Sequence, residues 1–102
     1  MPESKQLPHP FGDFIGLKPM QRENGFVAME LKAGPHHMNP YGVVNGSVAY
    51  AMLDNSMGGA TASTLAENET CATLEIKVNY LRAARPGALR AESRVIHRTS
   101  RF

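Results

Sequence analysis

The sequence predicts an α+β domain in which an antiparallel sheet packs around one long helix. Its 102 residues allow a single domain, 1–102, with a modest core that oligomerisation would help to complete. One apolar segment, 45–67, is typical of a buried helix, and three shorter segments, 26–32, 72–81 and 89–98, alternate apolar and polar side chains as strands do. The order strand, helix, strand, strand favours an antiparallel sheet.

Residues 1–24 are expected to lead into this domain. Three prolines among residues 1–10 favour an extended segment. A short helix or turn is predicted over residues 11–17, ending near Gly16. Residues 19–25 are polar and typical of a loop.

The first predicted strand covers residues 26–32. Its alternation places one apolar set on a single face of the sheet, and this set comprises Val27, Met29 and Leu31. The triplet Ala33-Gly34-Pro35 ends the strand. Residues 36–46, which contain a proline and two glycines, are expected to form a loop.

The long helix is expected to begin near Asn45 or Ser47, either of which can cap it, and to end near residue 65 or 67. Apolar side chains occupy most of its faces, which is typical of a helix that is buried all round. The pair Gly58-Gly59 lowers helix propensity, so we expect another backbone to approach the helix closely at this point.

The last two predicted strands, 72–81 and 89–98, are separated by the turn Arg85-Pro86-Gly87. Together they are expected to form an antiparallel hairpin. Cys71 stands just before the first of them. No His/Asn partner pattern surrounds this cysteine, so it is expected to be a small strand-entry residue rather than a nucleophile.

Charge is distributed unevenly along the chain. The net charge of +2 is too small to indicate a nucleic-acid partner, and no nucleic-acid motif is present. Residues 82–102, however, hold six arginines against one acidic residue. This basic end is typical of a protein with an anionic partner, such as a phosphate-bearing ligand. Alternatively, the arginines lie on a solvent-exposed face of a strand and have no partner. The sequence leaves both interpretations open.

The remaining compositional signals concern compartment and metals. Cys71 is the only cysteine, so no intrachain disulfide can form, and a reducing cytoplasm is the simplest compartment. The polar N-terminus shows neither a signal peptide nor a membrane span. His9, His36 and His37 have no cysteine or carboxylate at ligand spacing, so no metal site is expected.

Three segments together carry a resemblance to a known family, namely residues 39–47 (NPYGVVNGS), Leu53-Asp54 and Met57-Gly58. They resemble the hotdog-fold acyl-CoA thioesterases of the phenylacetate-degradation type. That family's pattern is Asn-x-x-Gly-x-x-His-Gly-Gly, with an Asp eight residues after the first Gly of the final pair. Gly46 and Asp54 have this spacing. Asn79-Tyr80-Leu81 and Arg85-Pro86-Gly87 are also similar to the family.

The resemblance implies a hotdog fold, in which an antiparallel sheet wraps around one long central helix. It also implies hydrolysis of an aryl- or medium-chain acyl-CoA thioester without a metal or redox cofactor, by a homodimer or homotetramer. Members of the family usually continue for two more strands, which lie in the middle of the sheet. We therefore expect a sheet truncated at the C-terminus, with unpaired edges.

The sequence departs from the family pattern at two positions. The usual His is Asn45, and the second Gly is Ser47. Both are expected to contact substrate. An asparagine can still form hydrogen bonds, but it does not titrate near neutral pH.

Gly46 and Asp54 are the principal candidate catalytic residues. Gly46 stands at the helix N-terminus, where unsatisfied N–H groups and the helix dipole can stabilise an oxyanion. Asp54 on a buried helix must be paired, have a raised pKa or face a cleft, which suits a base or nucleophile. The alternative is a carboxylate satisfied by a local hydroxyl, that of Tyr50 or Ser56.

Eight residues of one helix separate Gly46 from Asp54 by about 12 Å along its axis. One thioester carbon cannot touch both residues of the same chain. Either only one of them acts, or the site combines Gly46 of one subunit with Asp54 of another. The resemblance implies the second arrangement.

Four further residues are secondary candidates. Asn39 can orient a water molecule, or it can hold the loop through an Asx-turn before Pro40. Thr73 matches a family position whose hydroxyl helps to place the water near the Asp, and is otherwise an ordinary strand residue. Arg82 and Arg85 follow the strand where the family often contacts the CoA nucleotide, and are otherwise surface charges. An acyl-CoA-binding protein with weak or no turnover, or a structural remnant without activity, remains an alternative to the enzyme.

Overall fold

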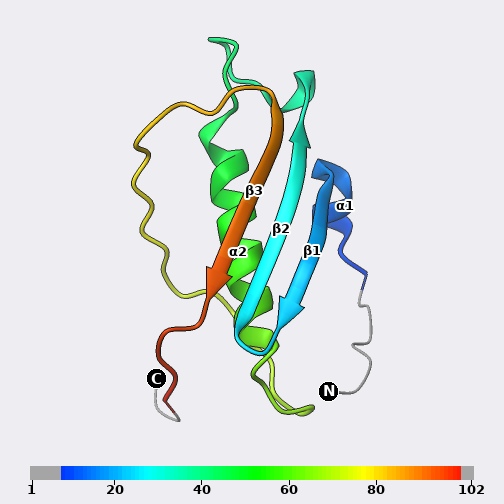
Figure 1. Ribbon diagram of the computed structural model, residues 1–102, viewed down its shortest axis with the longest axis vertical. Coiled ribbons are helices and arrows are strands. Elements are labelled where there is room, and N and C mark those ends of the chain that lie inside the picture. Colours follow the sequence, from blue (N-terminus) through cyan, green and yellow to red (C-terminus); the bar gives the residue numbers. More distant parts are fainter. Residues whose placement is uncertain (1–7, 100–102) are drawn as a thin grey trace.

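The computed structural model describes residues 8–99, in which a three-stranded antiparallel sheet lies against one long helix (Figure 1). The elements follow in the order α1 (Pro10–Ile15), β1 (Leu17–Glu23), β2 (Phe26–Ala33), the 3₁₀ helix η1 (Pro35–His37), α2 (Gly46–Ala62) and β3 (Gly87–Arg94). The strand order is β1-β2-β3, so β2 is central. The predicted α+β class is therefore confirmed.

The core lies between α2 and the inner face of the sheet. The helix buries one stripe at four-residue spacing, consisting of Val48, Met52, Ser56 and Ala60. The facing side chains of β2 are buried as predicted, namely Val27, Met29 and Leu31. The prediction that α2 is buried all round is wrong for the described residues. Tyr50 and Met57 remain 42% and 38% exposed, because three strands cover only one side of the helix.

Helix α2 begins where predicted, with Asn45 as its N-cap, but it ends at Ala62, before the predicted end. The expected close approach is found at only one of the two glycines. A Cβ atom at Gly59 would lie 3.3 Å from Cγ2 of Val27, whereas a Cβ at Gly58 would meet nothing within 4 Å. The partner is a side chain of β2 rather than its backbone.

The N-terminal third of the chain contributes more structure than predicted. The short helix is confirmed as α1, and Gly16 ends it with a φ of 84°. The loop predicted over residues 19–25 is wrong, because residues 17–23 form β1 and pair with β2. Strand β1 is an edge strand with only its first residue buried, so it has no apolar alternation. Pro19 is tolerated beside an irregularity between Pro19 and Gln21. The extended form expected for residues 1–7 lies outside the described residues.

The strand predicted over residues 72–81 is also wrong for this structure. The segment runs beside α2 and pairs with no strand among residues 8–99 (Figure 1). The predicted hairpin with 89–98 is therefore absent as well, since β3 pairs with β2 and spans 87–94. An alternating sequence can form a strand only beside a hydrogen-bonding neighbour, and here neither the segment nor the outer edge of β3 has one within the described chain.

Candidate active site

The loop before α2 is folded by Asn39. Its side-chain oxygen accepts hydrogen bonds from the backbone N–H groups of Tyr41 (2.8 Å) and Val43 (3.3 Å). The loop is closed further by a β-bridge between Met38 and Val44. The side-chain oxygen of Asn39 therefore holds the loop, as the Asx-turn interpretation predicts, and its NH2 group has no partner within residues 8–99.

The N-terminus of α2 is capped by Asn45. Its Oδ1 accepts hydrogen bonds from both the backbone N–H of Ser47 (3.0 Å) and the Ser47 hydroxyl (2.8 Å). The N–H of Gly46 has no acceptor in the described part of the chain. This free donor lies at the positive end of the helix dipole, where a developing negative charge is stabilised.

Tyr80 packs over Gly46. Its hydroxyl donates a hydrogen bond to the Gly46 carbonyl oxygen (2.9 Å), and its ring carbon Cε1 lies 3.4 Å from the position that a Cβ of residue 46 would take. A side chain at position 46 would therefore press on this ring. The role of Tyr80 was not predicted, although it belongs to the family-like segment Asn79-Tyr80-Leu81.

An open groove of about 420 Å³ lies beside this helix terminus. Its walls include four of the predicted site residues, namely Asn39, Asn45, Gly46 and Arg82, and also Tyr80. Ala49 and Leu81 add apolar surface. Arg85 and Ser47 do not line the groove. The loop before α2, the helix terminus and the segment after residue 79 thus converge on one cavity.

Asp54 belongs to a second cluster. Asp54 as a residue is half-buried, and its carboxylate accepts an exposed hydrogen bond from the Thr73 hydroxyl at 2.6 Å. The alternative partners expected from sequence are not used, since the Ser56 hydroxyl bonds to Ser93 and to the Leu53 carbonyl. The structure therefore brings together Asp54 and Thr73, which lie far apart in sequence.

The two clusters do not meet within one chain. Asp54 is absent from the walls of the groove, and eight residues of α2, about 12 Å, separate it from Gly46. The arrangement provides a hydrogen-bond donor and a groove at the N-terminus of α2, and a carboxylate with a hydroxyl partner at the middle of the same helix.

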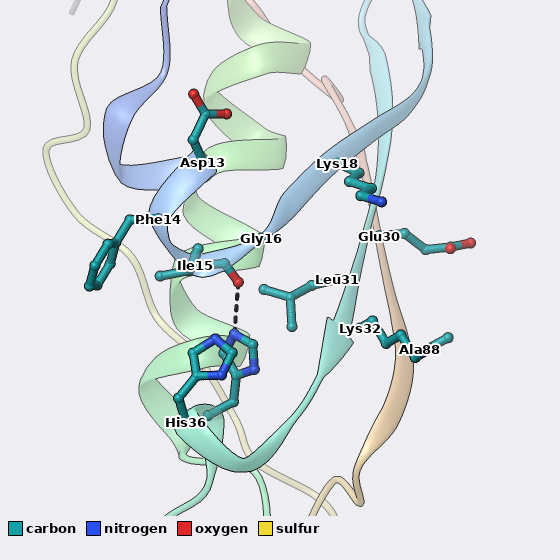
Figure 2. A pocket seen from close by; sticks show the side chains of 11 residues that line it. Asp13, Phe14, Ile15, Gly16, Lys18, Glu30, Leu31, Lys32, His36 and Ala88 are labelled. Carbon is teal, nitrogen blue, oxygen red and sulfur yellow. Dashed lines mark hydrogen bonds between the residues drawn. The ribbon is translucent and has the colours of Figure 1, made fainter.

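A second groove, also of about 420 Å³, lies between α1, η1 and the sheet (Figure 2). The buried His37 beside it is a structural residue. Its Nδ1 accepts a hydrogen bond from the Gly34 N–H (3.0 Å), and its Nε2 donates one to the Ile15 carbonyl oxygen (2.7 Å), so it joins α1 to η1. Within residues 8–99, no group of three or more His, Cys, Asp or Glu side chains is placed to hold a metal ion. Nor is any helix in that range long and apolar enough to cross a membrane.

The sequence model of the thioesterase superfamily matches residues 41–102. A conserved protein from Pseudomonas aeruginosa is 31% identical with a TM-score of 0.89, and the match covers 98% of this chain and 80% of that one. A phenylacetic acid degradation-related protein from Ralstonia eutropha JMP134 is 27% identical with a TM-score of 0.84, with coverages of 94% and 75%.

A phenylacetic acid degradation protein from Thermus thermophilus is 20% identical with a TM-score of 0.83, and it shares the fold. The matches cover 91% of this chain and 78% of that one. No curated protein sequence matches the chain. The predicted hotdog architecture is confirmed by these structural matches.

Proposed function

Because the chain belongs to the thioesterase superfamily, we propose that it is an acyl-CoA thioesterase that hydrolyses an aryl- or medium-chain acyl thioester. The observation that carries this proposal is the hydrogen bond from Thr73 to Asp54, which lies on the same helix that presents the free N–H of Gly46. Such a carboxylate and such a donor are the two groups that thioester hydrolysis requires.

The Gly46 N–H is the proposed oxyanion donor. As water adds to the thioester carbon, the carbonyl oxygen gains negative charge, and a fixed N–H at a helix N-terminus stabilises that charge. Removing one such donor from an enzyme typically lowers the rate by about 10²- to 10³-fold. Asn39, whose oxygen is held by the loop, offers its NH2 group to position the water or the substrate.

Asp54 is the proposed general base. Its carboxylate removes a proton from the attacking water, the C–S bond breaks, and the CoA thiolate leaves and takes up a proton. The Thr73 hydroxyl donates its hydrogen to Asp54, so its own oxygen remains able to accept a hydrogen bond from the water. Direct attack by Asp54 on the thioester carbon is the other route open to this carboxylate.

A complete site in this proposal needs two subunits. Gly46 and Asp54 are about 12 Å apart along one helix, so Gly46 of one chain works with Asp54 of the partner in a homodimer or homotetramer. The segment beside α2 supplies exposed apolar side chains for such an interface, since Leu74 is 77% and Leu81 is 92% exposed.

Arg82 and Arg85 are the proposed contacts to the CoA phosphates. Arg82 lines the groove next to Gly46, and Arg85 is exposed three residues later. A guanidinium group binds phosphate through two parallel hydrogen bonds, which suits an anionic nucleotide.

One observation favours a second candidate, an acyl-CoA-binding protein with weak turnover. Position 45 carries an asparagine whose oxygen is used to cap α2. It cannot act as a titrating group near neutral pH, so any proton transfer must depend on Asp54.

The test compares the parent chain with the variants Asp54→Asn and Asp13→Asn on a panel of aryl- and medium-chain acyl-CoA thioesters. Asp13 lies on α1, does not line the Gly46 groove and receives the same chemical change. We expect Asp54→Asn to lower kcat by about 10²- to 10⁴-fold with little change in binding, because it removes the base and keeps the shape. Asp13→Asn should retain full activity.

Two outcomes would contradict the enzyme. Unchanged turnover in Asp54→Asn would remove Asp54 from the mechanism. Binding of acyl-CoA by the parent without turnover of any panel member would favour the binding protein instead.

A further inference from the structure

We propose that His37 is a pH-sensitive switch, which holds the loop before α2 in place while its imidazole is neutral and loosens that loop when the ring is protonated. His37 is only 5% exposed, and the proposed hydrolysis does not use it. The inference therefore stands independently of the proposed function. It concerns the segment from Gly34 to Asn45, which connects β2 to the start of α2.

His37 joins three parts of the chain. Its backbone N–H donates a hydrogen bond to the Gly34 carbonyl oxygen (2.9 Å), which closes η1. Its carbonyl oxygen accepts one from the N–H of Asn45 (2.8 Å), the N-cap of α2. Its side chain bonds to the carbonyl oxygen of Ile15 at the end of α1 (2.7 Å). A displacement of His37 therefore affects α1, η1 and the loop that leads to Gly46.

The hydrogen-bond partners of the His37 ring fix its protonation state. Nδ1 lies 3.0 Å from the backbone nitrogen of Gly34, and Nε2 lies 2.7 Å from the carbonyl oxygen of Ile15. A backbone N–H can only donate and a carbonyl oxygen can only accept, so Nδ1 carries no hydrogen and Nε2 carries one. Both hydrogen bonds therefore exist together only in the neutral tautomer with its hydrogen on Nε2.

Protonation of His37 removes the acceptor for the Gly34 N–H. The added hydrogen on Nδ1 points at that N–H, so one hydrogen bond is lost and two donors face one another in a buried place. Burial of an unpaired charge adds a further cost. Imidazoles typically change charge between about pH 5 and 8. The loop is therefore held at neutral pH and above, and it loosens as the pH falls through that range.

The charged groups near His37 do not offer the protonated ring a partner within residues 8–99. The titratable side chains that line the groove beside it are Asp13 of α1, Lys18 of β1, Glu30 and Lys32 of β2, and His36 of η1 (Figure 2). Strand β3 contributes only Ala88 to this groove, and α2 contributes no residue. Neither acidic side chain bonds to the ring, and Glu30 lies opposite Lys18 in the sheet. The His36 ring, with its centroid 3.8 Å from that of His37, gains a second positive charge on acidification.

The test measures hydrogen exchange of the full chain by mass spectrometry at about pH 7.5 and about pH 5, a range that spans imidazole titration. Protection factors are calculated against an unstructured peptide at the same pH, so the chemical effect of pH on exchange cancels. We expect the protection of fragment 34–45 to fall about tenfold between the two pH values, because protonation removes one buried hydrogen bond.

Two variants separate His37 from its neighbour. His37→Gln does not titrate in this range. It should show reduced protection of fragment 34–45 already at about pH 7.5, with less than about twofold further loss at about pH 5. His36→Gln makes the same chemical change at the adjacent exposed histidine and should keep the roughly tenfold loss of the parent.

A second measurement uses the parent alone, so it does not depend on how the variants fold. The ¹⁵N signals of the His37 ring distinguish the neutral Nε2–H tautomer from the charged ring. We expect this tautomer at about pH 7.5 and the charged ring at about pH 5. A neutral ring with its hydrogen on Nδ1, unchanged protection of fragment 34–45 on acidification, or a loss in His37→Gln equal to that of the parent would each overturn the inference.

Discussion

Two neighbouring glycines of α2 allow a stringent test of how the helix packs on the sheet. Gly58→Ala and Gly59→Ala make the same chemical change at adjacent positions, so their gains in helix propensity, about 1 kcal/mol each, are equal. Their surroundings differ. A Cβ at Gly58 meets open space, whereas a Cβ at Gly59 lies 3.3 Å from Cγ2 of Val27 and 3.8 Å from Cε of Met29.

The room available for a Cβ atom at each position determines the expected change in the free energy of unfolding. Gly58→Ala should raise the free energy of unfolding by about 1 kcal/mol. Gly59→Ala makes the same gain but must displace the β2 side chains, and overpacking a core costs about 1–3 kcal/mol. The free energies of unfolding of the two variants should therefore differ by about 1–3 kcal/mol, and propensity cancels from this difference. In a domain of this size, about 1 kcal/mol corresponds to about 4–8 °C in Tm.

The assay is urea unfolding followed by far-UV circular dichroism, with equal slopes m required before midpoints are compared. The parent chain is the common reference for both variants. Equal stabilities for the two variants, or a more stable Gly59→Ala, would show that α2 does not pack on Val27 as described.

Two further predictions concern single contacts. Ser56→Ala should destabilise the fold more than Ser93→Ala, by a difference on the order of 1 kcal/mol in urea unfolding, because Ser93 would lose its partner whereas Ser56 keeps the Leu53 carbonyl; the reverse order would contradict this. The pKa of Glu69 lies below its ordinary value, mainly because its carboxylate accepts a hydrogen bond from the backbone N–H of Ala66, with a smaller effect of Arg98. The Glu69 carboxylate therefore stabilises the fold at pH values above its ordinary pKa, and this stabilisation is lost as the pH falls through the pKa of the folded state. Glu69→Gln should therefore lower the Tm slightly at about pH 7 and not at about pH 2, and an equal deficit at both would refute the assignment.

The sequence contained clear signals for elements whose burial is periodic. Strand β2 alternates because one face packs on α2, and Asn45 marks the helix start because its side chain caps Ser47. Strand β1 gave no such signal. It is an edge strand with only Leu17 buried, so its pairing depends on β2 rather than on its own pattern.

Residues 72–81 show the opposite case. The apolar alternation is strong, yet the segment pairs with no strand within the described chain. Alternation indicates a tendency to form a strand, but it does not show that a neighbouring strand is present to pair with.

The candidate site was predictable only in part. The family-like spacing predicted Gly46 and Asp54 as site residues, and these roles stay predictions. The resemblance also predicted that Thr73 lies near Asp54, and the hydrogen bond between them shows this contact. The packing of Tyr80 on Gly46 was not predictable, because it joins residues 34 positions apart through a ring contact with no sequence pattern. Contacts of this kind depend on how the segment after residue 70 returns along α2.

The outer edge of β3 has a consequence for how stability should be measured. Within residues 8–99 no strand pairs with this edge, so the backbone groups that face away from β2 remain available to an added extended chain. Any chain that binds there binds the folded domain and not the unfolded one. By mass action the free energy of unfolding then rises with the concentration of that chain, including further copies of the protein itself. If copies of the chain pair at this edge, the measured free energy of unfolding depends on protein concentration, so it should be measured at several concentrations.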